Sequence, residues 1–290
     1  MRPSPVALAL LLAASCLAGC ASLAPATADA AGPHAVPDDN LNAVLWMQRS
    51  VEYRAASEGI YRAAAERLDE ALADPRWNAL VPGELGGTAA SLPPAVVMDV
   101  DETVLDNSPY QARLVRDGLE YDDATWAGWV EERKARPVPG VVEFARAASA
   151  KGVTILYVSN REQRLAEATL ANLRSAGLPV ADDDVFLGLG TVVAGCEQAG
   201  SGKTCRRQLA GRKYRVLMQF GDQLGDFAET AGTSAARDAL YAEYRTWFGE
   251  RWWLLPNPTY GSWEPALWEN RRGLSREAKR EAKRDAMRVN

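Results

Sequence analysis

Three short apolar runs, at residues 95–98, 153–158 and 216–220, most constrain the fold of this chain. Each run has the length of a buried strand. Stretches with a helical pattern, at about residues 138–150 and 161–176, lie between the runs. Short buried strands that alternate with helices are typical of α/β proteins. The pattern therefore predicts a Rossmann-like parallel sheet with helices on both faces.

Polar residues follow each of the three runs. Asp99 and Asp101 follow the first run, Ser159 and Asn160 the second, and Asp222 the third. Because the carboxyl ends of parallel strands meet at one edge of the sheet, and ligands bind there, we expect these side chains to lie close together. One Asp-x-Asp pair alone is consistent with an ordinary acidic turn. Two carboxylates so close repel each other, however, and a divalent cation relieves that repulsion.

The rest of the chain divides into further segments. With 290 residues, 47% of them apolar, it can form a full core and an accessory region. Apolar residues at four-residue spacing predict a helix from about residue 40 to 73, and residues 251–255 read as another strand. We expect a signal peptide at 1–19, a tether at 20–39, a helical region at 40–92, a core at 93–270 with a helical cap at about 106–140, and a basic helical tail at 271–290.

The N-terminus has the features of a bacterial lipoprotein signal peptide. A positive residue, a short apolar run and small residues before Cys20 resemble a lipobox, in which that cysteine carries the lipid. Ala21 then points to the outer membrane under the familiar sorting rule. The alternative is ordinary secretion, with cleavage in the Ala-rich segment that follows. We expect a cell-envelope protein held to the outer membrane by a lipid anchor at Cys20.

The cysteines, the single histidine and the net charge restrict the kinds of site and partner that the protein can have. Cys196 and Cys205 are an even pair in an oxidising compartment, so we expect them to form one disulfide, around Lys203. His34 is the only histidine and falls in the tether, which disfavours zinc sites and excludes histidine-based hydrolases. The formal net charge of −5 gives no indication of a nucleic-acid partner.

The order of the polar motifs resembles a known superfamily. Residues 99–103, 159–161, Lys203 and 221–226 follow one another as in the haloacid dehalogenase (HAD) superfamily of phosphotransferases. Within it, the chain resembles the class C, lipoprotein-type bacterial acid phosphatases, over about residues 40–270. The finer match rests on residues 105–110, 137–140 and 257–264. The resemblance implies a HAD-like core with a smaller helical cap.

The resemblance also implies a mechanism. Asp99 would be the nucleophile that forms an aspartyl-phosphate, and Asp101 would be the general acid and base. Mg²⁺ would be held by the Asp99 carboxylate, the Asp101 backbone carbonyl and the Asp222 carboxylate. Asp226 would orient a metal-bound water from outside the ligand set, or would simply cap a helix. The four acidic residues thus have separate expected tasks.

Phosphate would be bound by residues from two other motifs. Ser159 and Asn160 would donate hydrogen bonds to it, and a helix beginning at Arg161 would present free amides to the same anion. Lys203 would supply a fixed positive charge. Two alternatives stay open for Lys203: it is a solvated lysine, or a neighbouring arginine contacts the phosphate instead.

Two aromatic residues concern the substrate. Trp126 and Tyr260 match positions that flank a nucleobase or aryl leaving group in the class C enzymes, although both are also consistent with packing residues. We expect a Mg²⁺-dependent acid phosphatase that hydrolyses phosphomonoesters such as nucleoside monophosphates and aryl phosphates. The alternatives are a non-catalytic surface-binding lipoprotein and a phosphotransferase on the same fold. The sequence leaves oligomer formation open.

Overall fold

The computed structural model describes residues 38–86, 91–198, 200–230 and 232–289, and residues 38–290 form one compact unit. The predicted signal peptide, the predicted lipid attachment site Cys20 and nearly all of the predicted tether lie outside the described residues. Of the helices in the described ranges, none combines the length and the apolar character needed to cross a membrane.

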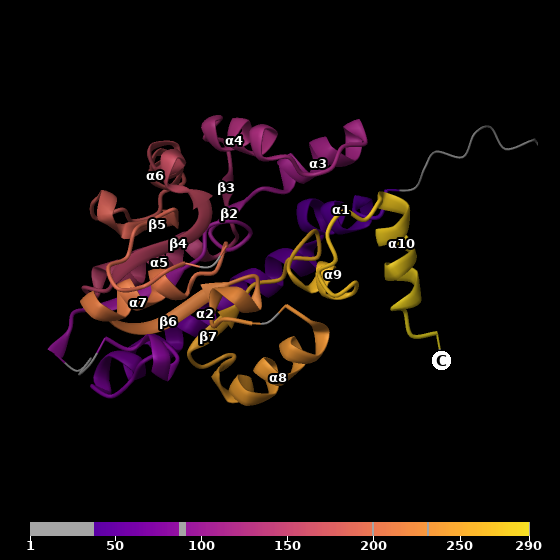
Figure 1. Ribbon diagram of the computed structural model, residues 1–290. Coiled ribbons are helices and arrows are strands. Elements are labelled where there is room, and N and C mark those ends of the chain that lie inside the picture. Colours follow the sequence, from indigo (N-terminus) through magenta and orange to yellow (C-terminus); the bar gives the residue numbers. More distant parts are fainter. Residues whose placement is uncertain (1–37, 87–90, 199, 231, 290) are drawn as a thin grey trace, which may run out of the picture. The chain divides into compact units, whose positions relative to one another are not determined.

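A five-stranded sheet forms the centre of the unit, and all its strand pairs are parallel (Figure 1). The strand order is β5-β4-β1-β6-β7. The strands are β1 (Pro94–Met98), β4 (Thr154–Glu162), β5 (Phe186–Leu189), β6 (Arg215–Gly221) and β7 (Trp252–Leu254). This architecture confirms the predicted parallel α/β fold. Only β5 was missed, because its four residues include a glycine and show no distinct apolar period.

Helices cover both faces of the sheet, as burial along its strands shows. Every residue of β6 is buried, and only the first residue of β1 is partly exposed. Helices α2 (Val51–Ala73) and α5 (Val141–Ala150) pack on each other, and α7 (Thr204–Lys213) packs on β4 and β6. Helix α6 (Ala166–Ser175) lies against β5. The core is therefore closed, and only the strand ends are open to ligands.

The N-terminal region forms two helices, so the prediction of one helix from residue 40 to 73 was wrong. Helix α1 (Leu41–Arg49) ends at Ser50, where α2 begins. Ser50 has an extended backbone, and its side chain accepts a hydrogen bond from the Tyr53 amide at 3.0 Å. A serine that caps the next helix in this way interrupts the first. The predicted end at about residue 73 is confirmed, because α2 ends at Ala73 and Asp74 is its C-cap.

The cap stands on a short antiparallel ribbon of β2 (Leu105–Asp106) and β3 (Arg136–Pro137). It contains two helices, α3 (Ser108–Asp117) and α4 (Asp123–Glu131), beyond that ribbon in Figure 1. Gly118 ends α3 in a left-handed conformation with φ of 65°, and Asp122 caps α4 through its side chain. The cap is therefore formed by the segment between β1 and α5.

The C-terminal part adds α8 (Ser234–Tyr244), α9 (Trp263–Ala266) and α10 (Arg276–Asp285). Basic side chains of α10 pair with acidic residues of other segments, among them Asp39, Glu120 and Glu264. Short 3₁₀ helices complete the fold: η1 (Pro82–Glu84), η3 (Gln163–Leu165), η4 (Asp183–Val185), η5 (Leu224–Asp226) and η6 (Arg245–Trp247). The predicted basic tail is thus a helix bound to the unit by ion pairs.

Candidate active site

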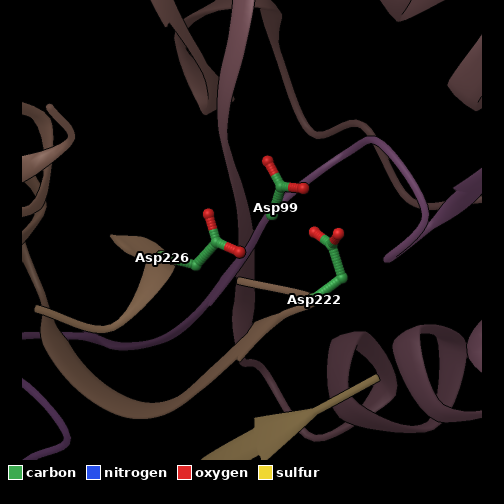
Figure 2. Close-up of side chains that lie close together, drawn as sticks. All are labelled: Asp99, Asp222 and Asp226. Atoms are coloured by element: carbon green, nitrogen blue, oxygen red, sulfur yellow. The ribbon is translucent and has the colours of Figure 1, made fainter. Parts of the chain in front are cut away.

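Three carboxylates meet at the carboxyl edge of the sheet. Asp99 follows β1, Asp222 follows β6, and Asp226 ends η5. Figure 2 shows their carboxylates turned toward one another, and one oxygen from each lies within 4.8 Å of the others. Since β1 and β6 are parallel neighbours, their ends bring residues more than 100 positions apart into one cluster. The strand pattern in the sequence predicts that Asp99 and Asp222 lie close together.

Burial makes negative charge costly in this cluster. Burial raises the pKa of Asp99 to about 7, and the pull of Lys203 toward a lower value only partly offsets it. Burial also raises the pKa of Asp222 well above its usual value, and the charges of Asp226 and Asp99 add to that effect. A divalent cation would remove the cost. Three converging carboxylates are the hard oxygen donors that Mg²⁺ prefers, so the residues fit such an ion.

Lys203 supplies one buried positive charge to the cluster. Its Nζ donates to Asp99 Oδ1, and also to Asp226 Oδ1 at 2.6 Å. Burial alone would lower the pKa of Lys203, but the charges of Asp226 and Asp99 outweigh that effect and the pKa is raised. Lys203 is only 5% exposed, so it is not the solvated lysine that one alternative describes.

Neighbouring polar groups orient the two later aspartates. Asp222 Oδ2 accepts hydrogen bonds from Gln223 Nε2 at 2.6 Å and from Asn257 Nδ2 at 2.8 Å. Asp226 Oδ2 accepts a hydrogen bond from the backbone amide of Gln223 at 2.9 Å, while the other oxygen of Asp226 faces Lys203. Asp226 therefore caps η5 and also belongs to the carboxylate cluster.

The Asp101 side chain has different surroundings from these three. Its Oδ1 accepts hydrogen bonds from Arg161 Nε and from Asn107 Nδ2, both at 2.9 Å. Glu102 follows in a left-handed conformation, with φ of 57°, and turns the chain immediately after Asp101. Such a conformation is costly for a residue with a side chain and is typical of functional sites. The carboxyl groups of Asp99 and Asp101 thus have different partners.

Residues 159–161, the polar motif after the second apolar run, belong to a strand. The prediction of a helix that begins at Arg161 was therefore wrong. Strand β4 continues to Glu162, and α6 begins only at Ala166. Ser159 Oγ accepts a hydrogen bond from the Arg161 amide at 3.0 Å, and Glu162 pairs with Leu189 of β5. The chain therefore stays extended where a helix would have presented free amides. Helix amides are not available to phosphate at this position.

Asn160 is held through its oxygen. Arg206 Nη2 donates to Asn160 Oδ1 at 2.8 Å and to the Gly202 carbonyl at 2.9 Å, and Arg206 Nη1 donates to the Ser159 carbonyl. This arrangement leaves the Asn160 amide nitrogen to donate to a ligand. Arg206 also ties the loop that carries Lys203 to the end of β4.

The structure joins Cys196 and Cys205 in a disulfide, nine residues apart in the sequence. Lys203 lies inside the loop that the disulfide closes, two residues before Cys205. The neighbouring Arg207 is fully buried and donates to Glu84 at 2.7 to 3.0 Å. Arg206 and Arg207 thus contact backbone carbonyls, Asn160 and Glu84, whereas Lys203 contacts the carboxylates of Asp99 and Asp226.

The two aromatic residues lie on separate elements. Trp126, on α4, is partly buried and contacts Tyr110 with ring centroids 5.1 Å apart. The Arg161 guanidinium lies 5.6 Å from the Trp126 ring centroid. Tyr260 follows β7, and its hydroxyl donates to Glu102 Oε2. Stacking of a substrate on either ring remains a prediction.

Four residues that orient the aspartates have no predicted role in the sequence: Asn107, Arg161, Gln223 and Asn257. Asn107 and Asn257 stand inside motifs 105–110 and 257–264, which supported only the family resemblance. For Arg161, the sequence pattern predicts only the start of a helix. Polar residues inside these motifs are a signal in the sequence, but they do not reveal their partners, because Asn257 lies 35 positions and Arg161 lies 60 positions from the aspartate that each contacts. Asn107 lies only six positions from Asp101.

The chain is similar to known acid phosphatases in sequence and in fold. The family model of acid phosphatases, HAD superfamily subfamily IIIB, matches residues 11–263. The class C acid phosphatase from Bacillus anthracis is 33% identical, with a TM-score of 0.74, over 87% of this chain and 97% of that one. The same enzyme with tungstate bound has a TM-score of 0.75 over the same shares of the two chains.

Plant proteins are more distant relatives. Acid phosphatase 1 from Solanum lycopersicum is 28% identical over 57% of either chain. The stem 31 kDa glycoprotein from Glycine max is 25% identical over 57% of this chain and 58% of its own. The chain thus spans little more than half the length of these relatives. Since the family model covers most of the sequence, and the bacterial structure shares its fold, the chain belongs to the acid phosphatases of HAD superfamily subfamily IIIB.

Proposed function

We propose that this protein hydrolyses phosphomonoesters through an aspartyl-phosphate on Asp99, with Mg²⁺ as cofactor. The observation that carries the proposal is that two carboxyl groups, close together in the sequence, have different surroundings in the structure. Asp99 lies with Asp222, Asp226 and Lys203, whereas Asp101 lies with Arg161. The surroundings of Asp99 suit a nucleophile, because cations neutralise negative charge there. The surroundings of Asp101 suit a proton donor, because they are separate from that cluster.

In the first step, an Asp99 oxygen attacks the phosphorus of the ester. The bond between phosphorus and the leaving oxygen breaks, and that oxygen takes a proton from Asp101. In the second step, water attacks the same phosphorus and gives a proton to Asp101. The bond to Asp99 breaks, inorganic phosphate leaves, and both aspartates return to their starting states.

The other residues of the site bind and orient the phosphate group. The Asn160 amide nitrogen and the Ser159 hydroxyl donate to phosphoryl oxygens, and Lys203 neutralises their charge. Asp99, Asp222 and the Asp101 backbone carbonyl would hold Mg²⁺, with Asp226 beside them. When bound, the ion neutralises charge on the phosphoryl group and on the carboxylates around it.

The substrate class is inferred from the aromatic residue on the cap. Trp126 belongs to α4 and lies against Arg161, which contacts Asp101. A planar leaving group that stacks on this ring would gain ~1–3 kcal/mol. We therefore favour nucleoside monophosphates and aryl phosphates.

Phosphate release from p-nitrophenyl phosphate and from nucleoside monophosphates tests the proposal, with the purified protein before and after chelation and with Mg²⁺ restored. We expect release at acidic pH that stops with chelator and returns with Mg²⁺. Turnover that survives complete metal removal would contradict the role of the cation. Binding of these esters without any release would instead support a surface-binding protein.

We also propose that the protein is a lipid-anchored component of the cell envelope, directed to the outer membrane. The support is the sequence alone: a short apolar leader, small residues and Cys20. The substrate would then be a soluble phosphomonoester met in the envelope.

A further inference from the structure

Two buried side chains, Arg161 and Asn107, hold one oxygen of Asp101. Arg161 is 1% exposed and Asn107 is fully buried. Arg161 Nε donates to Asp101 Oδ1 at 2.9 Å, Arg161 Nη2 lies 2.8 Å from the same oxygen, and Asn107 Nδ2 donates to it at 2.9 Å. Oδ1 is therefore fully occupied as an acceptor.

The other oxygen of Asp101 has a looser environment. Ser159 Oγ lies 3.5 Å from Oδ2, a distance at which a hydrogen bond is weak. The Asp101 side chain is 16% exposed, so the carboxyl group can still be reached from the site. Of the two oxygens, Oδ2 is thus the one free to exchange a proton with a ligand.

The orientation of Asn107 is determined by further donors. Trp129 Nε1 donates to Asn107 Oδ1 at 2.8 Å, and Arg161 Nη2 donates to the same oxygen at 3.2 Å. Because two donors meet that oxygen, the Asn107 amide nitrogen must face Asp101. The Asn107 backbone amide donates to Glu102 Oε1 at 2.7 Å, which ties it to the turn after Asp101.

The charge of Arg161 is also matched to Asp101 alone. Within the described ranges, Asp101 is the one carboxylate within ion-pair distance of Arg161. The remaining nitrogen, Nη1, lies 3.5 Å from the Thr169 hydroxyl. A buried guanidinium needs a fixed partner, because a buried charge without one is costly.

We propose that Arg161 and Asn107 are positioning residues for the acid–base step, holding Asp101 Oδ1 so that Oδ2 faces the leaving oxygen. The inference rests on the proposed phosphatase activity. Arg161 and Asn107 act through Asp101 and do not contact the phosphoryl group. Their loss therefore weakens proton delivery to the leaving oxygen and spares phosphate binding.

The test compares two substrates that differ in their need for a proton. p-Nitrophenolate leaves readily as an anion, whereas phenolate leaves much less readily and needs general-acid assistance. The kcat/KM values for p-nitrophenyl phosphate and phenyl phosphate include the step in which the leaving oxygen departs. They are measured for the wild type, Arg161→Lys and Asn107→Ser, together with inhibition by inorganic phosphate.

We expect both variants to lose ~10-fold more kcat/KM on phenyl phosphate than on p-nitrophenyl phosphate, since general-acid assistance is typically worth ~10²–10⁴-fold. Inhibition by inorganic phosphate should stay within about twofold of wild type, because neither residue contacts the bound phosphate. Equal losses on the two substrates, or a large loss of phosphate inhibition, would overturn the proposal. A wild-type protein that hydrolyses neither ester would instead refute the proposed function itself.

Arg215→Lys is the matched control. Arg215 is a buried arginine at the start of β6, and its guanidinium donates to the Ala71, Leu72 and Asp74 carbonyls at the end of α2. Its substitution should lower thermal stability and leave the ratio of the two kcat/KM values unchanged. Near-UV circular dichroism checks folding, and Asn107→Ser carries the test if Arg161→Lys does not fold. If neither variant folds, the two residues are structural and the positioning role is refuted.

Discussion

Asp99 and Asp101 are separated by one residue, yet their carboxyl groups accept hydrogen bonds from different cations. Asp99 Oδ1 accepts from Lys203, and Asp101 Oδ1 accepts from Arg161 at 2.9 Å. Lys203 and Arg161 come from different segments, the loop before α7 and the end of β4. The two aspartates can therefore carry out different steps of one reaction.

Asp99→Asn should abolish phosphate release. The amide is a poor nucleophile, so no aspartyl-phosphate can form, and we expect a loss of at least ~10³-fold in kcat. Release of p-nitrophenol measures it. Asp183→Asn is the control, because Asp183 is an exposed aspartate paired with Arg174 away from the cluster. Near-wild-type turnover by Asp99→Asn would refute Asp99 as the nucleophile.

Mg²⁺ should stabilise the protein more as pH rises. In the metal-free state, the pKa of Asp99 is raised to about 7 by burial, so the folded protein binds a proton there more tightly than the unfolded chain. That contribution to stability is complete below the usual pKa of an aspartate and is lost as pH rises through about 7. Because Mg²⁺ competes with this proton, it binds best where the proton has left.

Thermal unfolding with Mg²⁺ and with chelator, between pH 5 and pH 8, measures this linkage. The gain in Tm from Mg²⁺ should be small at the acidic end and reach a few degrees at the alkaline end. Asp222→Asn should reduce the gain at every pH, since it removes one carboxylate from the cluster. A gain that is independent of pH would be inconsistent with a protonated Asp99 in the metal-free protein.

Removal of the disulfide should destabilise the protein. Cys196 and Cys205 are nine residues apart, and closing a loop of that length is worth about 2–3 kcal/mol in the chain-entropy model. The Cys196→Ser, Cys205→Ser double variant should therefore unfold at a lower temperature, by about 4–10 °C. Reductant should lower the Tm of the wild type toward that value and leave the variant unchanged. Equal stability of the two proteins would show that the disulfide does not constrain the unfolded chain.

The buried pair of Glu84 and Arg207 should contribute far more than a surface pair. Glu84→Gln leaves the fully buried Arg207 guanidinium without its counter-charge, so we expect a loss of about 3–5 kcal/mol. The matched control is Glu70→Gln, which removes an exposed pair with Arg67 and should cost far less, because solvent screens that pair. Urea unfolding monitored by circular dichroism measures both. Similar losses in the two variants would contradict the difference that burial implies.

Cys20→Ala tests the lipid anchor. Radioactive palmitate supplied to cells that express the full chain should label the wild type, and the label should disappear in Cys20→Ala, because the thiol is the attachment point. Cys16→Ala is the control and should keep the label, since Cys16 lies in the predicted signal peptide. A labelled Cys20→Ala protein would refute lipidation at this residue.

The sheet and its reactive edge were largely predictable from the sequence. The apolar runs before Asp99, Ser159 and Asp222 are buried strands, and polar residues at such strand ends are placed by the topology of a parallel sheet. Weak local signals led to the errors. The four residues of β5 carry little periodicity, and the break at Ser50 interrupts an otherwise continuous helical pattern.

The sequence by itself determined the fold class and the residue types of the catalytic edge, because burial periodicity and strand-end polarity are local properties of the chain. Only the tertiary structure decided which cation faces which aspartate. Arg161 lies 60 positions from Asp101, and Lys203 lies 104 positions from Asp99. A side chain's partner at such a separation is set by how strands and loops pack, so the extended end of β4 and the loop before α7 gave each aspartate its own environment.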